Sequence, residues 1–176
     1  MTEDGKNETE IKRRIEIARN AFYNMSKMLT SRSIKVQTKK RLVKCYIWST
    51  LLYGGEKWTL TRAMIGKIEA FEMWVYRKIL KISYTEHRTN EYVLQKMNTR
   101  RSLMNTIKQR KCVYFGHLIR GDGLQRLLLE GKFNGKRGRG RPRFTWFSNI
   151  KEWTGMNYAE AIRKAQHRED WASMTA

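Results

Sequence analysis

The side chains best suited to chemistry in this sequence are the cations of one short stretch, KFNGKRGRGRPRFTWF (residues 132–147). Its six Lys/Arg are spaced by glycines and include the only proline of the chain between them. Cationic side chains neutralise phosphates and release condensed counterions, and glycine lets an extended backbone lie close to a groove. We expect the basic loop, residues 132–144, to bind phosphates through Lys136, Arg137, Arg139, Arg141 and Arg143.

Positive charge is concentrated around this loop. Residues 100–143 contain thirteen Lys/Arg and two acids, a difference of +11 in a chain whose formal net charge is +21. A cationic region of this size favours a polyanionic partner. Trp146, just after the loop, is a candidate for stacking on a base, with a place in the core as the alternative. We expect the phosphate-binding surface to continue over Arg100, Arg101, Lys108, Arg110 and Lys111.

An anionic membrane is the weaker choice of partner. The sequence has no run of about 18 or more apolar residues, which a membrane-spanning helix needs. Its start, MTEDGKNETE, is acidic and polar, unlike a signal peptide. We therefore expect RNA or DNA as the partner, and no membrane.

The groups needed for metal-assisted phosphoryl transfer are missing. The three aspartates, Asp4, Asp122 and Asp170, are widely separated, so no adjacent pair could hold two Mg²⁺ ions. The sequence has no GxxxxGK[ST] loop, and its two cysteines and three histidines lack the spacing of zinc ligands. We expect no catalytic residue, no metal site and no cofactor in this chain.

The two thiols and the basic string indicate a cellular compartment. Cys45 and Cys112 lie in apolar segments with helical spacing, so we expect both to be reduced core residues of an intracellular protein. The string GKRGRGRPR also fits a nuclear-localisation signal, which favours the nucleus.

Helices must position these groups, because apolar residues recur at helical spacing and no segment shows sustained period-two alternation. We predict an all-α fold, with helices over residues 7–29, 33–53, 62–82, 90–97, 100–121 and 158–174, and a short apolar piece over residues 124–131. Four residues are predicted to cap helix N-termini: Asn7 with Glu10 as reciprocal partner, Thr61, Thr89, and Asn157 with Glu160.

A shift in composition near residue 98 divides the predicted fold into two parts. Residues 1–98 are expected to form a helical bundle, and residues 99–176 a smaller, basic, glycine-punctuated helical module. The bundle core is expected to include one face of each of two helices. In the 62–82 helix, where Trp74 widens it, this face comprises Met64, Ile68, Phe71, Val75, Ile79 and Ile82. In the 7–29 helix it comprises Ile11, Ile15, Ala18, Phe22, Met25 and Leu29.

Four blocks of sequence, in this order, resemble the C-terminal portion of non-LTR (LINE-type) retrotransposon endonuclease/reverse transcriptases. The blocks are LLYGGEKWTLT, IEAFEMWVYRKILKISYTEHRTNEYVL, the long segment RKCVYFGHLIRGDGLQRLLLEGKFNGKRGRGRPRFTWFSNIKEWTG, and AQHREDWASM. The resemblance covers essentially the whole chain. It implies that residues 1–98 correspond to the end of the palm and the thumb, and residues 99–176 to the region after the thumb.

The resemblance implies a binding role without chemistry. Catalysis in that family depends on an aspartate motif of the [FY]xDD kind and on fingers that bind the nucleotide, and neither occurs in this sequence. The chain is therefore expected to be a non-catalytic fragment that holds template RNA, RNA–DNA hybrid and target DNA during target-primed reverse transcription. The other reverse transcriptase domains, whose parent polymerase would use Mg²⁺, are its expected protein partners. Trp48, Tyr53 and Trp58 are expected to be core residues at a joint between thumb helices.

A different function remains open. The tetrapeptide RGRP, from Arg139 to Pro142, matches the core of the AT-hook, whose arginines enter the narrow minor groove of AT-rich DNA. The alternative is thus a free-standing, architectural DNA-binding protein.

Overall fold

The computed structural model describes residues 7–121, 123–130 and 144–175. Every regular element in these ranges is a helix and none is a strand, so the predicted all-α fold is confirmed. The chain divides into two compact units, Met1–Gly55 with Leu60–Ile107 and Glu56–Thr59 with Lys108–Ala176. The two units meet between Ile107 and Lys108, within the helix α7 (Leu103–Arg120). The assignment of a helical bundle to residues 1–98 and of a nucleic-acid-binding module to residues 99–176 stays a prediction.

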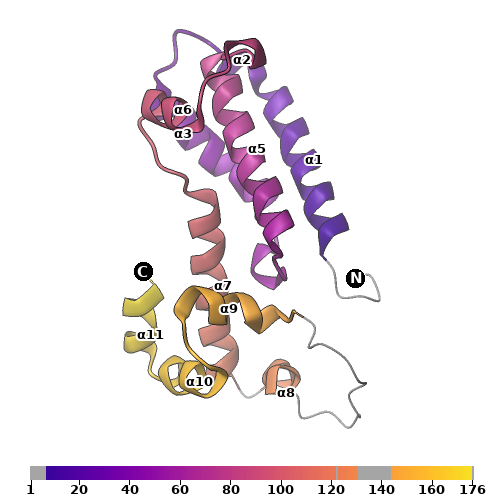
Figure 1. Ribbon diagram of the computed structural model, residues 1–176, viewed down its shortest axis with the longest axis vertical. Coiled ribbons are helices and arrows are strands. Elements are labelled where there is room, and N and C mark those ends of the chain that lie inside the picture. Colours follow the sequence, from indigo (N-terminus) through magenta and orange to yellow (C-terminus); the bar gives the residue numbers. More distant parts are fainter. Residues whose placement is uncertain (1–6, 122, 131–143, 176) are drawn as a thin grey trace. The chain divides into compact units, whose positions relative to one another are not determined.

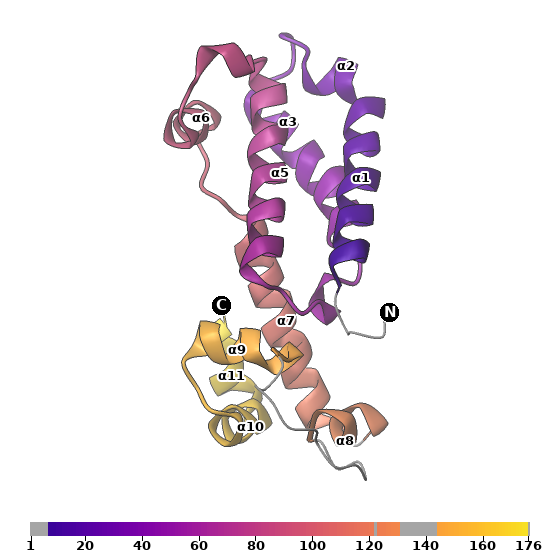
Figure 2. The same ribbon diagram turned by 45° about the vertical axis from the view of Figure 1, so that its right-hand side comes forward.

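The first unit is a helical bundle in which α1 (Glu8–Asn24) and α5 (Arg62–Leu80) lie side by side (Figures 1 and 2). The predicted helix over residues 33–53 is replaced by three consecutive segments, because its middle turn widens into a π-helix. The other helical segments before residue 98 are α2 (Ser26–Leu29), α3 (Val36–Leu42), η1 (Val43–Trp48), α4 (Ser49–Leu51), η2 (Gly55–Lys57), η3 (Tyr84–Glu86) and α6 (Asn90–Met97).

The core of the first unit comes from the two apolar faces that the spacing predicts. Trp74 packs edge-on against Phe22, with ring centroids 5.1 Å apart, and stacks on Phe71 at 5.6 Å. The buried residues of these faces are Ile11, Ala18 and Phe22 in α1, Leu29 in α2, and Met64, Ile68, Phe71, Val75 and Ile79 in α5. The predicted members Ile15, Met25 and Ile82 are only half-buried.

Two of the three predicted aromatic core residues near LLYGGEKW are buried. Trp48 is 6% exposed and Trp58 is 3% exposed. The prediction for Tyr53 is wrong, since this side chain is 70% exposed and its ring lies 4.6 Å from the guanidinium carbon of Arg14. Helix α4 ends at Leu51 and the chain turns at Gly54 (φ +71°), which carries Tyr53 out of the bundle.

Three of the four predicted helix caps are confirmed. The hydroxyls of Thr61 and Thr89 accept hydrogen bonds from backbone amides at the starts of α5 and α6, and Asn157 forms the predicted reciprocal pair with Glu160. The prediction for Asn7 is wrong, because its side chain makes no capping hydrogen bond. Its expected partner, Glu10, instead accepts a hydrogen bond from Arg14 Nε at 2.7 Å.

A buried carboxylate holds the start of α7 (Leu103–Arg120) within the first unit. Glu72 is 0% exposed, and its Oε1 accepts hydrogen bonds from the amides of Ser102 at 2.9 Å and Leu103 at 3.2 Å. It also accepts one from the hydroxyl of Tyr76 at 3.1 Å. Burial beside this carboxylate raises the pKa of Tyr76. A negative charge at a helix N-terminus is favourable, so Glu72 acts as a remote cap.

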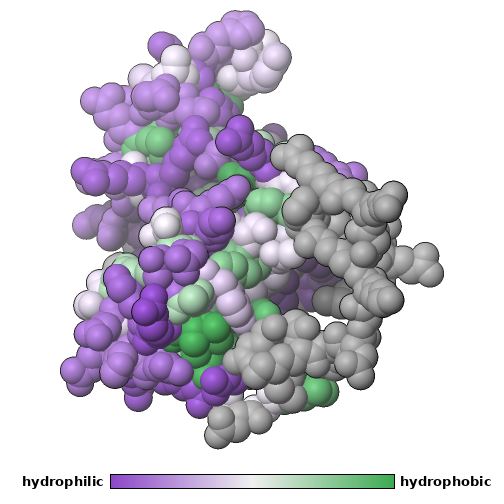
Figure 3. Space-filling model, turned by 60° about the horizontal axis from the view of Figure 1, so that its bottom comes forward, coloured by the Kyte–Doolittle hydropathy of each residue, from purple (hydrophilic) through white to green (hydrophobic). Residues whose placement is uncertain are grey.

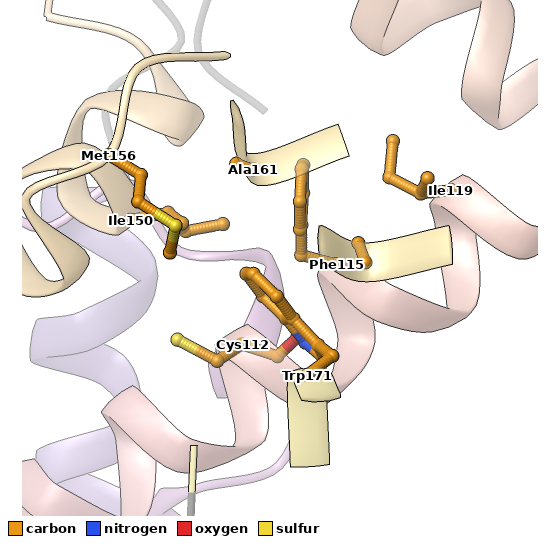
Figure 4. Close-up of a cluster of buried hydrophobic side chains, with 8 residues drawn as sticks. Cys112, Phe115, Ile119, Ile150, Met156, Ala161 and Trp171 are labelled. Atoms are coloured by element: carbon orange, nitrogen blue, oxygen red, sulfur yellow. The ribbon is translucent and has the colours of Figure 1, made fainter. Parts of the chain in front are cut away.

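The second unit packs the rest of α7 against α9 (Trp146–Thr154), α10 (Tyr158–Gln166) and α11 (Arg168–Thr175), and it includes α8 (Leu124–Glu130). Its hydrophobic core is drawn in Figure 4, where Trp171 lies beside Phe115 with ring centroids 5.4 Å apart. The buried members of this core are Cys112, Phe115, Ile119, Ile150, Met156, Ala161, Ala165 and Trp171.

The predicted last helix, over residues 158–174, is broken at His167. Helix α10 ends there with an extended backbone (φ −90°, ψ 106°), and the carbonyl of His167 then accepts the first bond of α11 from the amide of Trp171 at 3.1 Å. After this break Trp171 packs into the core and its Nε1 donates to the Cys112 carbonyl at 2.8 Å. Burial of Trp171 and the hydrogen bond of its indole N–H therefore favour a broken helix here, although the sequence has continuous helical periodicity.

The surface is mainly polar. Figure 3 shows one face on which hydrophilic residues predominate, with smaller hydrophobic areas between them. Within the described ranges no helix combines the length and the apolar character needed to cross a membrane.

Candidate nucleic-acid interface

The predicted phosphate-binding cations are distributed over three places. Those of the basic loop lie outside the described residues: Lys136, Arg137, Arg139, Arg141 and Arg143. Arg100 and Arg101 belong to the first unit, and Lys108, Arg110 and Lys111 belong to the second. The loop itself connects α8 to α9.

In the first unit the two arginines before α7 have different surroundings. Arg100 is exposed. Arg101 is half-buried and its guanidinium lies 3.2 Å from a carboxylate oxygen of Glu69. Arg101 also lines a pocket of about 330 Å³ together with Arg77 and Asn90. Of this pair, Arg100 is the more accessible to a phosphate.

In the second unit α7 presents positive charge without acids. Residues 103–120 contain four Lys/Arg and no Asp or Glu. Arg110 is exposed. Lys108 is half-buried, with its Nζ 5.8 Å from the centre of the Trp153 ring. Arg110 and Lys108 are therefore placed where a nucleic acid could approach this helix.

Lys111 does not reach the surface. Its side chain is 0% exposed, and its ammonium donates hydrogen bonds to the Trp58 carbonyl at 2.6 Å and to Asn149 Oδ1 at 2.8 Å. The Nζ atom also lies 4.8 Å from the ring centre of Trp146 and 5.5 Å from that of Trp153. Every one of these groups belongs to the second unit, so Lys111 ties α7 to α9 and to the segment 56–59.

The environment of Lys111 disfavours its charge. Burial lowers the pKa of Lys111 to about 7, and the neighbouring Cys112 thiolate acts in the opposite direction. Burial in turn raises the pKa of Cys112. The hydrogen bonds of this side chain are made inside the second unit, and its ammonium has no open path to a phosphate.

Trp146 also has a structural role. It is half-buried against the core of the second unit, its ring lies at 6.1 Å from that of Tyr114, and its Nε1 donates to the Glu56 carbonyl at 2.9 Å. Because it is the first residue of α9, it fixes the helix that directly follows the basic loop. The core alternative for Trp146 therefore fits its position better than base stacking.

Residues from two of the four resemblance blocks meet in this unit. Glu56 and Trp58 come from LLYGGEKWTLT, and Lys111 and Trp146 come from the long third block. Their contacts explain the spacing of these blocks as a requirement of packing.

A second meeting point involves Gly116. A Cβ atom on this residue would lie 2.7 Å from Trp171 Cδ1 and 2.9 Å from Trp171 Nε1, so the indole occupies the space beside the glycine. One turn later, Arg120 donates to the Ala165 carbonyl at 2.6 Å. The FGHLIRG and QHREDW blocks are thus joined by close packing of α7 with α10 and α11.

Another cationic region was not singled out by the sequence prediction. Residues 17–55 contain eight Lys/Arg and no acid. Lys35, Arg41 and Lys44 are exposed, whereas Lys39 is 5% exposed and its pKa is lowered by burial and by nearby Lys81. The sequence feature that indicates this region is the long run of residues without Asp or Glu. It is less conspicuous than the closely spaced Lys and Arg residues of the basic loop.

Neither metal-binding nor thiol chemistry is prominent in the described ranges. No group of three or more His, Cys, Asp or Glu side chains there could hold a metal ion. Asp4 and Asp122 lie outside those ranges, and Asp170 is exposed on α11. Both cysteines are free thiols: Cys112 is buried as predicted, but the prediction for Cys45 is wrong because this residue is exposed, on the outer side of the π-helical segment.

Comparison with known proteins gives one similarity. The chain is 28% identical over 149 residues to an uncharacterized transposon-derived protein of Caenorhabditis elegans. The match covers 81% of this chain and 53% of that protein, so the chain spans about half the length of the relative. No protein-family model and no solved structure matches the chain. The similarity is consistent with a transposon origin.

Proposed function

We propose that this chain binds RNA and DNA as the non-catalytic, C-terminal part of a non-LTR retrotransposon reverse transcriptase. In this role it holds template RNA, the RNA–DNA hybrid and target DNA, and the other reverse transcriptase domains are its protein partners. The similarity to a transposon-derived protein supports the origin. The nucleus, where target DNA lies, is the compartment that this function requires.

One observation carries the proposal, the concentration of cations in residues 100–143. The region has thirteen Lys/Arg against two acids. Elsewhere many cations are compensated: in α1, for example, Lys12, Arg14 and Arg19 each lie within 3.2 Å of a glutamate oxygen. An excess of cations in one region raises the self-repulsion of the folded chain, and a bound phosphate backbone relieves it.

The proposed contacts are fewer than the sequence alone suggests. We retain as phosphate contacts the five cations of the basic loop together with Arg100, Lys108 and Arg110. Arg101 is also retained, although its guanidinium is in addition paired with Glu69. Lys111 is left out because its donors are used inside the second unit. Contacts of this kind bind the phosphate backbone and give affinity without reading the base sequence.

The first experiment measures binding as a function of salt. Labelled RNA–DNA hybrid, RNA hairpin and mixed-sequence DNA duplex are titrated with the full chain by fluorescence anisotropy. If roughly 6–10 phosphates are engaged, affinity falls on the order of 10³–10⁵-fold between about 50 and 200 mM salt. Absence of binding to all three ligands at low salt would refute the proposal.

Two neighbouring residues supply a matched pair of variants. Arg110→Ala removes an exposed cation, and Lys111→Met removes a buried one from the next position of the same helix. Arg110→Ala is expected to weaken binding to each ligand by a similar factor and to reduce the salt slope by about 1. Lys111→Met is expected to leave the salt slope unchanged. Equal effects of the two variants would contradict the assignment of the surface.

The RGRP tetrapeptide makes an AT-hook the second candidate function. An AT-hook protein prefers AT-rich duplex and loses that preference when Arg139 and Arg141 are both replaced by Ala. The main proposal expects the double variant to weaken all ligands alike. A comparison of AT-rich and GC-rich duplexes therefore separates the two functions.

A further inference from the structure

The first unit displays a tyrosine that its own fold does not use. Tyr84 is 90% exposed, more than any other large hydrophobic side chain in the described part of the chain. It lies in the turn η3 (Tyr84–Glu86), which follows α5 and precedes α6 in the chain. Its ring contacts that of His87, at a centroid distance of 5.8 Å. A ring exposed to this extent contributes little to the packing of the first unit, and its face is available to a ligand.

The turn that carries Tyr84 is held in one conformation. Ser83 and Glu86 form a reciprocal cap, in which the Ser83 amide donates to Glu86 Oε1 at 2.9 Å. The turn is bounded by two non-glycine residues in the left-handed region, Lys81 (φ 57°) and His87 (φ 46°). Such conformations persist only where the surrounding structure enforces them. Tyr84 is therefore presented on a preformed support.

A pocket of about 450 Å³ lies beside this turn, a size typical of small-ligand sites. Its lining combines aromatic rings with guanidinium groups and one small aliphatic side chain, that of Ala70. The residues that matter for recognition are Trp74, Arg77, Ser83, Tyr84, His87 and Arg88.

The cations of the pocket are positioned by their neighbours. Arg77 donates to the Arg88 carbonyl at 3.0 Å and to Asn90 Oδ1 at 2.9 Å through one terminal nitrogen. A guanidinium has five N–H donors, so these two contacts orient Arg77 without using its full capacity. The guanidinium of Arg88 lies 4.9 Å from the Tyr92 ring centre and its Nε is 3.8 Å from Glu86. Both arginines are thus held at the edge of the aromatic pocket.

Rings beside fixed cations suit one class of ligand. Unpaired nucleotides bind proteins by stacking bases on aromatic side chains while cations hold the adjacent phosphates. A base in a duplex cannot do this, because both of its faces are covered by neighbouring pairs. The pocket therefore suits a single strand and is unsuited to a double helix.

We propose that this pocket of the first unit holds one unstacked base of single-stranded RNA or DNA, with Tyr84 as the stacking platform and Arg77 and Arg88 beside the flanking phosphates. The inference rests on the proposed nucleic-acid function and adds to it a site specific for single strands. No residue that lines this pocket belongs to residues 100–143.

The test compares single and double strands for the full chain and three variants. A labelled oligonucleotide is offered as DNA, as RNA and as duplex, and affinity is measured by anisotropy. Tyr84→Ala is expected to weaken single-strand binding by about 5- to 150-fold, the range for one base–aromatic stack, and to leave duplex binding unchanged. Tyr84→Phe keeps the ring and is expected to restore single-strand affinity. Tyr53→Ala, the control, removes a tyrosine that is 70% exposed and does not line the pocket.

A second measurement locates the base directly. Oligonucleotides carrying 5-iodouracil are irradiated in complex with the chain, and the adducts are mapped after trypsin digestion. Cleavage after Lys81 and Arg88 releases residues 82–88, which contain both Tyr84 and His87. The DNA and RNA forms of the probe show which sugar the site accepts. An adduct on this peptide, absent in Tyr84→Ala, is the expected result.

The outcomes separate the two proposals. If the chain binds every nucleic acid with steep salt dependence but Tyr84→Ala binds single strands as well as the parent does, the pocket assignment is overturned and the proposed function survives. If the parent chain binds no nucleic acid at all, both fail. Equal losses for Tyr84→Ala and Tyr53→Ala would likewise overturn the site, since the effect would not belong to the pocket.

Discussion

The buried ammonium of Lys111 gives the sharpest prediction about stability. The perturbation is Lys111→Met, which keeps an unbranched side chain among the rings of Trp146 and Trp153 but removes the titrating group. The comparison is the free energy of unfolding of the parent chain and of the variant, each measured across pH. Their difference isolates Lys111, because all other titrating groups are common to both chains.

The magnitude follows from the two pKa values. Burial lowers the pKa of Lys111 from 10.5 to about 7 in the folded chain. Below pH 7 the amine is protonated in both states, and the cost of burying its charge destabilises the fold. Above pH 7 the folded state releases the proton while the unfolded state keeps it, so stability rises by about 1.4 kcal/mol per pH unit. Integrated from pH 6 to 8.5, the gain is about 2 kcal/mol.

The assay is urea unfolding followed by tryptophan fluorescence at pH 6 and pH 8.5, a range chosen to end below the ordinary pKa of the Cys112 thiol. The parent chain is expected to gain about 2 kcal/mol relative to Lys111→Met over this interval. A difference that stays constant with pH would refute the reasoning. It would mean that the two acceptors and the two indole rings keep the ammonium charged despite its burial.

Three further variants test the packing. Gly116→Ala is expected to lower the free energy of unfolding by about 1–3 kcal/mol, because the new Cβ meets Trp171 at 2.7 Å. The control is Gly66→Ala on α5, where a Cβ meets nothing within 4 Å. This control variant is expected to raise the free energy of unfolding by about 0.5–1 kcal/mol. Glu72→Ala is expected to cost about 3 kcal/mol in urea unfolding, since amides at the start of α7 lose their acceptor; a loss within about 0.5 kcal/mol would contradict the capping role. Trp74→Ala removes the ring that joins Phe22 to Phe71 and is expected to cost about 3 kcal/mol, and an unchanged melting curve would show that these contacts do not stabilise the bundle.

The helices were predictable from sequence wherever local chemistry decides their limits. Thr61, Thr89 and Asn157 accept hydrogen bonds from their own helix starts, and the α5 seam follows its apolar spacing. Asn7 does not cap α1, and its backbone (φ −89°, ψ 15°) lacks the extended conformation of the three confirmed caps. The break at His167 was not predictable, since it depends on a hydrogen bond between Trp171 and Cys112, 59 positions earlier.

In the candidate site, too, some features are set by local sequence and others by tertiary contacts. Charge density is a property of composition, so the cationic region could be identified from the sequence. Which cations are accessible depends on tertiary contacts: Lys111 and Arg110 are neighbours in a basic run, yet one is 0% exposed and the other lies on the surface. The lining of the pocket beside Tyr84 comes from one stretch of sequence, residues 70–88, but no motif marks it, and the exposure of Tyr84 depends on how the turn after α5 folds.

The segment 56–59 has a practical consequence for dissecting this polypeptide. It supplies two backbone carbonyls that receive Lys111 and Trp146, although it sits between helices of the other unit in the chain. A polypeptide that begins at residue 108 would retain the hydrophobic core of the second unit. It would leave the Lys111 ammonium and the Trp146 indole N–H without these two hydrogen-bond acceptors. Any attempt to isolate the C-terminal half should therefore graft these four residues back or begin upstream of Glu56.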